Sequence, residues 1–204
     1  MLSKGETVEL GEITCRVEEH VARGRVGDVY RVKEGEGNLY ALKIARDRRG
    51  PTLMSLRDEE SRTERLARAG LPFARIAARG RDYVLKEWVE GIRGDRWLGE
   101  WRKNGRPFPT PETLGLLNLF RRVMLNGLLA RDLNPTNLIW SEGCWILVDS
   151  DNIRKKGFRR ARLEILRAWA EEWADDSEEE KKFGKRLADI PAPEAGIEGK
   201  RREL

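Results

Sequence analysis

The sequence predicts an α+β protein in two parts, a small antiparallel sheet with one helix followed by a mostly helical part. Residues 7–45 alternate short apolar runs with turns, one helical segment follows, and apolar residues beyond position 110 recur at helical spacing. The 204 residues suffice for one sizeable core or two small ones. We expect the parts to span residues 1–90 and 91–190, with a flexible tail over 191–204.

In the first part, the turn 35–38 is typical of a hairpin whose second strand is 39–44. A helix is predicted from about Leu53 to Ala69, because Gly70 is placed to end it.

In the second part, Thr110 and Pro111 indicate a helix start with a cap and a proline in the first turn. The helix that begins here is rich in leucine, and its leucines are expected to form a buried spine. These residues are Leu114, Leu116, Leu117, Leu119, Leu125 and Leu128. Upstream, Trp97, Leu98 and Trp101 fall on one helical face, which favours packing over base stacking.

The next segment predicts a hairpin of two apolar strands, 138–140 and 145–148, joined by 141–144. An amphipathic helix is expected over 158–173, and Ser177 begins a capping box for another helix.

The composition favours a soluble cytoplasmic protein. The net charge is +5, and charged residues of both signs make up 37% of the chain, an abundance that suggests a thermophilic source. Cys15 and Cys144 have no metal-ligand spacing, so reduced structural thiols are expected. No apolar run is long enough to span a membrane, and residues 1–4 do not resemble a signal peptide.

The segment A-R-D-L-N-P-T-N-L-I over residues 130–139, followed by Asp149 after the hairpin, resembles the catalytic loop and metal-binding strand of the protein-kinase-like superfamily. The resemblance implies transfer of the ATP γ-phosphate with Mg²⁺. Asp132 would orient and deprotonate the acceptor hydroxyl, while Asn137 and Asp149 would hold the metal ions.

Two upstream motifs agree with this order. The segment 22–30 resembles the glycine-rich loop G-x-G-x-x-G-x-V, with alanine replacing the first glycine, so Gly24, Gly27 and Val29 would cover the nucleotide. In the A-L-K of the next strand, Ala41 would line the nucleotide site and Lys43 would contact the α- and β-phosphates.

A carboxylate from the following helix should pair with Lys43. Four residues compete for this role, and we favour Glu60, with Glu64 second. The competing residues are Asp58, Glu59, Glu60 and Glu64. The segment 83–91 resembles the strand and hinge that hold adenine, so Glu87 would offer a backbone carbonyl and Val89 a backbone N–H and C=O.

The departures from the family pattern concern the substrate. Alanine replaces the histidine of H-R-D, Ser150 and Asp151 replace the phenylalanine and glycine of D-F-G, and no activation segment or A-P-E motif follows. The chain is therefore similar to the minimal, RIO-like atypical kinases, including small archaeal kinases that act on tRNA.

A run of basic residues takes the place of the activation segment. It comprises Arg154, Lys155, Lys156, Arg159, Arg160 and Arg162. It is either a solvated helix face or a site for RNA phosphates. An RNA hydroxyl, a ribose 2′-OH of tRNA, is the leading acceptor. A protein serine or threonine, a small molecule, and a pseudokinase scaffold are the alternatives, and no oligomeric state is predicted.

Overall fold

The computed structural model describes residues 1–24, 26–47, 56–105, 107–130, 133–149, 153–174 and 177–192. The fold is α+β, and the chain divides into two compact units. The first comprises residues 1–67 and 73–90, and the second comprises 68–72 together with the chain from Gly91 onward. Several predictions lie outside the described residues: the beginning of the helix at Leu53, Asp132, Ser150, Asp151 and most of the tail.

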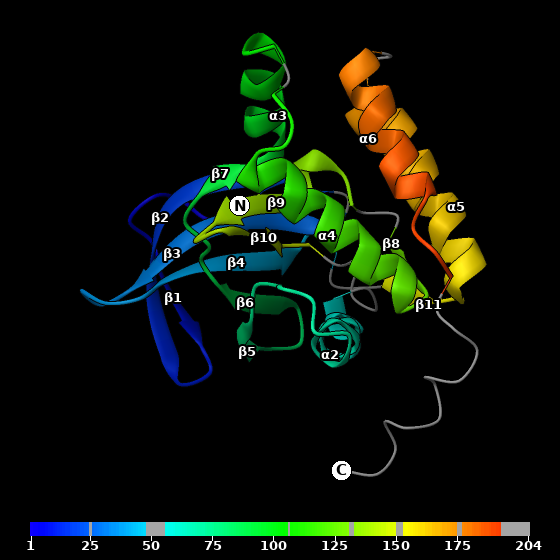
Figure 1. Cartoon of the computed structure of the whole chain (residues 1–204). Helices are drawn as coiled ribbons and strands as arrows, with labels where there is room; N and C mark the ends of the chain where they lie inside the picture. The colour runs from blue at the N-terminus through cyan, green and yellow to red at the C-terminus, as the bar shows by residue number, and fades with distance from the viewer. Residues whose placement is uncertain are drawn as a thin grey trace. The chain divides into compact units, whose positions relative to one another are not determined.

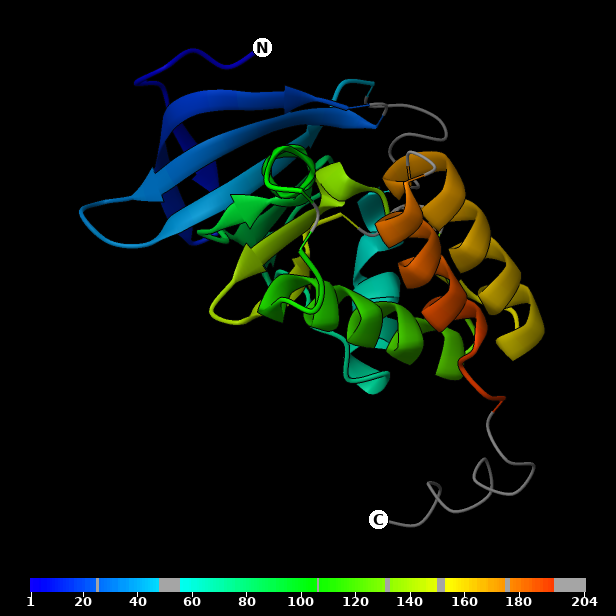
Figure 2. The same ribbon diagram turned by 45° about the horizontal axis from the view of Figure 1, so that its top comes forward.

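The first unit contains an antiparallel sheet with the strand order β1-β2-β3-β4-β6-β5 (Figures 1 and 2). Its strands are β1 (Thr7–Leu10), β2 (Ile13–Arg23), β3 (Gly27–Glu34), β4 (Leu39–Ala45), β5 (Ile76–Arg79) and β6 (Tyr83–Glu87). The predicted hairpin is confirmed, because β3 and β4 pair on either side of the turn 35–38.

Side chains alternate between the two faces of this sheet. On one face, Leu42 of β4 and Leu85 of β6 are fully buried in an aliphatic and aromatic cluster. On the other face, Val84 belongs to a second cluster with Val26 and Leu56. Lys43 alternates with Leu42 and pairs in register with Val84, so it belongs to this second face. Helix α2 (Glu59–Arg68) supplies two more buried polar residues of this unit, Glu59 and Arg62.

The second unit holds two small sheets and several helices (Figure 1). Its elements in order are β7 (Ile92–Arg93), α3 (Gly94–Lys103), α4 (Pro111–Leu125), β8 (Leu128–Ala130), the 3₁₀ turn η1 (Pro135–Asn137), β9 (Leu138–Ser141), β10 (Cys144–Leu147), β11 (Ile153–Lys155), α5 (Phe158–Ala168), the π-helical turn η2 (Trp169–Trp173) and α6 (Glu178–Ala188). Strands β10, β9 and β7 form one sheet, and β11 pairs with β8 in the other.

The core of this unit is aromatic. Trp97 stacks on Trp101, and Trp173 contacts Trp97, Phe120 and Trp145 edge-on or at a tilt. This confirms that the tryptophans of α3 pack internally.

Helix α4 starts as predicted, since the Thr110 side chain accepts a hydrogen bond from the Thr113 N–H. The leucine spine is only partly confirmed. Leu116 and Leu119 are buried on α4, and Leu128 is buried in β8 rather than on the helix. Leu114 and Leu125 are 47% and 36% exposed because they lie off the helix face that Leu116, Phe120 and Val123 direct to the core.

The helix predicted over 158–173 begins at Phe158 but changes at Trp169, where the α-helical bonding pattern gives way to a π turn. Helix α6 follows, capped by Ser177, whose side chain accepts from the Glu180 N–H at 3.2 Å. It lies beside α5 in Figures 1 and 2. Within the described part of the chain, no helix has both the length and the apolar character needed to span a membrane.

Candidate active site

The buried charges of the first unit centre on Glu59, which is fully buried at the start of α2. Its carboxylate lies 3.9 Å from the ammonium of Lys43 and also forms an ion pair with the ammonium of Lys86 on β6. Lys43 and Lys86 are 8% and 6% exposed. The two lysines share one face of the sheet because Lys86 pairs in register with Ala41, two residues before Lys43.

The prediction that Glu60 pairs with Lys43 is wrong. Glu60 forms its ion pair with Arg79 of β5, and both side chains are about half exposed. One residue along a helix rotates the side chain by about 100°, so Glu59 faces the sheet and Glu60 does not. Glu64, the second choice, lies on the exposed side of α2.

The glycine-rich segment joins β2 to β3 in a tight turn, closed by a 2.8 Å hydrogen bond from the Gly24 N–H to the Gly27 carbonyl. A Cβ at Gly27 would lie 2.1 Å from the Ile44 carbonyl oxygen of β4, so only glycine permits this approach. Val29 and Ala41 are half-buried in the adjoining strands. The loop is thus built on paired strands, although Arg25 at its tip lies outside the described residues.

The predicted hinge lies where the chain leaves the sheet. The Trp88 N–H donates to the Leu39 carbonyl at 3.1 Å, and the Glu87 N–H donates to the Arg75 carbonyl at 2.9 Å. Glu87 is exposed and Val89 is half-buried. Backbone pairing therefore holds the chain up to Trp88.

In the second unit, the β9–β10 hairpin brings Asn137 and Asp149 to the same end. Leu138 pairs with Leu147, and the Val148 N–H donates to the Asn137 carbonyl at 3.0 Å, so Asp149 follows directly after the residue bonded to Asn137. The Asn137 N–H is held by the Asn134 side-chain oxygen at 3.2 Å. Both Asn137 and Asp149 are half-buried. An amide and a carboxylate oxygen at one hairpin end fit Mg²⁺, which prefers hard oxygen ligands.

The predicted catalytic loop has contacts before and after residues 131–132, which lie outside the described residues. Before it, β8 pairs antiparallel with β11, with Ala130 opposite Ile153. After it, the Leu133 carbonyl accepts a 2.8 Å hydrogen bond from the indole N–H of Trp173. Asp132 lies between Ala130 and Leu133 in the sequence and outside the described residues.

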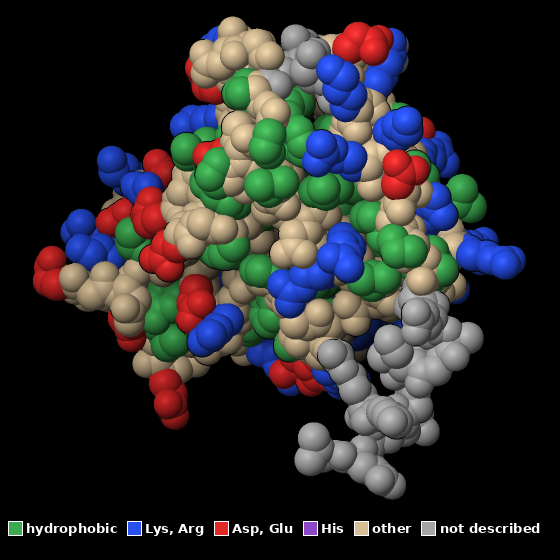
Figure 3. Space-filling view, in the orientation of Figure 1, with side chains coloured by type: hydrophobic (Ala, Val, Ile, Leu, Met, Phe, Trp, Pro, Cys, Tyr) green, Lys and Arg blue, Asp and Glu red, His purple; other side chains and the backbone are tan. Residues whose placement is uncertain are grey.

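The connection between Asp149 and α5 is short, as predicted, because α5 begins at Phe158. Strand β11 leads into α5 through Lys156 and Gly157, whose N–H groups donate to the Gly127 carbonyl at 2.8 and 3.1 Å. The six predicted RNA-binding residues differ in their exposure to solvent. Five are exposed, namely Arg154, Lys155, Lys156, Arg159 and Arg160, and we call these five the basic cluster. Lys and Arg side chains protrude at the right-hand edge of Figure 3, where α5 lies in Figure 1.

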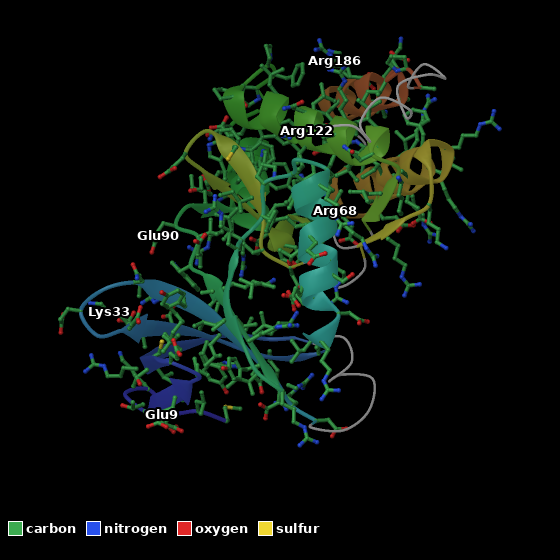
Figure 4. The ribbon with its side chains drawn as sticks, turned by 90° about the horizontal axis from the view of Figure 1, so that it is seen from below. Glu9, Lys33, Arg68, Glu90, Arg122 and Arg186 are labelled. Atoms are coloured by element: carbon green, nitrogen blue, oxygen red, sulfur yellow. The ribbon has the colours of Figure 1, made fainter. Side chains whose placement is uncertain are left out.

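Arg162 is the exception, because it is half-buried and its guanidinium donates to the Ala188 carbonyl at the end of α6. This contact favours a role in helix packing. A similar contact occurs on α4, where Arg122 donates to the Gly70 carbonyl (Figure 4). In both cases an arginine satisfies a carbonyl at or just beyond a helix end.

Sequence reasoning missed two residues of this arrangement. Lys86 falls in the strand before the hinge, and only strand alternation, which places it on the face of Val84 and opposite Ala41, could have indicated its role. Trp173 fits the pattern of an amphipathic helix, and no local signal indicates that its indole reaches the catalytic loop.

The arrangement can support a specific chemistry. A buried lysine held by a carboxylate suits a nucleotide phosphate, and the amide–carboxylate end of the hairpin suits the accompanying Mg²⁺, which would neutralise phosphate charge. The lysine belongs to the first unit and the hairpin to the second.

Comparison with known proteins bears on the fold. No protein-family model and no curated protein sequence matches the chain. Among solved structures, the chain is similar to the BubR1 kinase domain, with a TM-score of 0.58 and 15% identity over 76% of this chain and 51% of that one. It is also similar to the PknI kinase domain of Mycobacterium tuberculosis, with a TM-score of 0.52 and 19% identity over 82% of this chain and 75% of that one.

The fold is therefore that of a protein-kinase-like domain with two lobes. The chain spans about half the length of the BubR1 kinase-domain chain that it matches.

Proposed function

We propose that the protein is an ATP- and Mg²⁺-dependent phosphotransferase. The observation that carries this proposal is the buried Lys43–Glu59 pair on β4 and α2, in a kinase-like fold. An ordinary surface lysine would not be 8% exposed against a fully buried carboxylate. In the proposed reaction Lys43 binds the α- and β-phosphates, and Gly24, Gly27, Val29 and Ala41 cover the nucleotide. Backbone groups of Glu87 and Val89 hold the adenine.

The transfer step is assigned to the second unit. Asp132 orients the acceptor hydroxyl and takes its proton, and the hydroxyl oxygen attacks the γ-phosphorus as the bond to ADP breaks. Asn137 and Asp149 are the proposed Mg²⁺ ligands. When bound, Mg²⁺ neutralises the charge of the phosphates.

The acceptor that we propose is an RNA hydroxyl, a tRNA ribose 2′-OH, as in RIO-like minimal kinases that act on tRNA. The supporting observation is the basic cluster, whose five side chains are exposed on β11 and α5 and in the segment between them. It occupies the part of the chain in which ordinary protein kinases carry the activation segment that docks a peptide. Exposed arginine and lysine neutralise nucleic-acid phosphates and release counterions.

The first experiment measures transfer of labelled γ-phosphate from ATP into total RNA and total protein side by side, with Asp132→Ala as the control. We expect label in RNA from the parent protein, and a loss of about 10²–10⁴-fold in the variant. Label that appears only in protein would move the acceptor to a serine or threonine. No Asp132-dependent label in either fraction would contradict the proposed function.

The second experiment tests the basic cluster by changing Arg154, Lys155, Arg159 and Arg160 to glutamine. If all four neutralise phosphates, tRNA affinity should fall, and the log–log salt slope should flatten by about 0.9 for each duplex phosphate that is no longer neutralised. A matched control changes four exposed lysines to glutamine, at Lys103, Lys181, Lys182 and Lys185, which alters the net charge equally. Equal slopes in the two variants would make the cluster a solvated face.

A further inference from the structure

The catalytic loop is tied to the aromatic core by one side-chain hydrogen bond. The indole N–H of Trp173 donates to the Leu133 carbonyl at 2.8 Å, and Leu133 directly follows Asp132 in the sequence. Trp173 is fully buried and Leu133 is 1% exposed. The bond is therefore shielded from water, and no solvent can replace it when it breaks.

The position of this indole depends on the π turn. Trp173 is the last residue of η2, in which the Ala174 N–H donates to the Trp169 carbonyl at 2.9 Å, a wider turn than that of an α-helix. Such a turn changes the direction of the side chains that follow, and π turns occur frequently at functional sites. The stacked pair of Trp169 and Trp173 rings, with centroids 6.3 Å apart, brings the second indole into the core.

A partly buried ion pair also holds the backbone of Trp173. The Arg102 guanidinium of α3 donates to the Trp173 carbonyl at 2.9 Å and lies 3.2 Å from the Glu180 carboxylate of α6. Glu180 is fully buried. Arg102 thus links α3, η2 and α6, and each of its contacts is directional because the guanidinium is planar.

We propose that Trp173 is the positioning residue of the catalytic loop, held in place by Arg102 and Glu180. This inference rests on the proposed function. In the kinase motif, a histidine two residues before the catalytic aspartate packs against the loop, and this chain has Ala130 there. The tryptophan instead fixes the loop after Asp132 in the sequence, through the carbonyl of Leu133. The helices after the basic cluster therefore serve the loop as well as the core.

The consequence for catalysis follows from geometry. Without the indole N–H, the Leu133 carbonyl is buried without this donor, and the backbone next to Asp132 is free to move toward another partner. Phosphoryl transfer depends chiefly on positioning, and a displacement of about 1 Å can cost about 10²-fold in rate. Nucleotide affinity should fall less than the rate, because Lys43 and its ion pair lie in the other unit, although the proposed metal ligand Asn137 lies in the same loop.

The test compares Trp173→Phe with Trp145→Phe. The two rings are neighbours, with centroids 6.4 Å apart, and each indole donates to a backbone carbonyl at 2.8 Å. The acceptor of Trp145 is Glu112 at the start of α4, not the catalytic loop. Both variants remove one indole donor and similar ring volume, so they are matched for packing.

We expect Trp173→Phe to lower kcat by about 10- to 100-fold with a smaller change in the KM for ATP, and to speed hydrogen exchange of the amides over 133–137. Trp145→Phe should leave kcat within about twofold of the parent and speed exchange at the start of α4 instead. Equal kcat losses in the two variants, or unchanged exchange over 133–137 in Trp173→Phe, would overturn the proposal.

Glu180→Gln provides a second variant that retains the indole. It weakens the hold of Arg102 on the Trp173 backbone, so we expect the same faster exchange over 133–137 with a smaller fall in kcat. Unchanged exchange in this variant would remove Glu180 from the proposal. A parent protein that transfers no phosphate would refute the proposed function, while the exchange data would still decide whether Trp173 anchors the loop.

Discussion

The two units fix their functional residues by different means. In the first, Lys43 lies in β4, a strand hydrogen-bonded to β3 on one side and to β6 on the other, so the backbone ladder sets the position of its backbone, and the Glu59 carboxylate pairs with its ammonium group. In the second, the loop and helix ends have backbone carbonyls that no ladder satisfies. Tryptophan N–H groups fill this role at Pro107, Glu112 and Leu133. A sheet fixes the backbone of a residue through its ladder, whereas a loop needs side-chain donors.

The comparison extends to buried charge. The sheet unit places the Glu59 carboxylate between two lysines, and the helical unit places the Glu180 carboxylate against one arginine. The lysine arrangement leaves ammonium groups next to the proposed nucleotide site, while the arginine arrangement uses its charge on the backbone of Trp173.

The largest predicted stability effect comes from Glu59→Gln. Removing the buried carboxylate leaves two buried ammonium groups without this partner, so the free energy of unfolding should fall by about 3 kcal/mol and ATP affinity should fall with it. Denaturant unfolding and nucleotide titration measure the two effects.

Glu60→Gln is the matched control, since Glu60 is the neighbouring residue and its pair with Arg79 is about half exposed. Its loss should cost less than about 1 kcal/mol and should not change ATP affinity. Similar losses in both variants would mean that the two carboxylates contribute equally, contrary to this assignment.

A smaller effect separates the tryptophans of the two units. Trp145→Phe leaves the Glu112 carbonyl without its donor and should cost about 2 kcal/mol. In the described part of the chain, the Trp88 indole N–H is buried without an acceptor, and the Arg31 guanidinium lies 5.6 Å from the ring centroid. Trp88→Phe should therefore stay within about 0.5 kcal/mol of the parent. Thermal unfolding measures the stability of both variants. A larger loss of stability in Trp88→Phe than in Trp145→Phe would contradict this difference between the two tryptophans.

The smallest predicted effect is at the start of α4. Thr110→Ala removes the side chain that accepts from the Thr113 N–H at 3.3 Å, and should cost about 1 kcal/mol without altering phosphate transfer. Thr110→Ser, which keeps the hydroxyl, is the control and should recover most of this stability. If Thr110→Ser were as unstable as Thr110→Ala, the hydroxyl would not be the cap.

Strand and turn patterns predicted much of the fold. The hairpin around 35–38, the cap at Thr110 and the β9–β10 hairpin follow from alternation and from local turn and capping chemistry, which act over a few residues. The spacing of the β9–β10 hairpin also predicted that Asn137 and Asp149 lie at the same end, and the structure places them there. Their roles as metal ligands remain predictions.

The features that local patterns did not predict depend on helix phase and long-range contacts. Four acidic residues lie within two turns at the start of α2, and only the packing of the helix selects Glu59 over Glu60. The π turn at Trp169 interrupts an amphipathic pattern that reads as a continuous helix. Arg162 is part of a basic run in the sequence, yet its acceptor is a carbonyl at the end of a helix many residues away.

The central claim is that Lys43 and Asp149 belong to a Mg·ATP site. Calorimetric titration of the protein with ATP, with and without Mg²⁺, tests it most directly. We predict Mg²⁺-dependent binding by the parent protein and by Asp132→Ala, weakened at least about tenfold in both Lys43→Met and Asp149→Ala, because each removes a charged group that would bind the Mg·ATP complex. ATP binding that needs no metal, or that survives unchanged in both Lys43→Met and Asp149→Ala, would contradict the assignment of a Mg·ATP site to these residues.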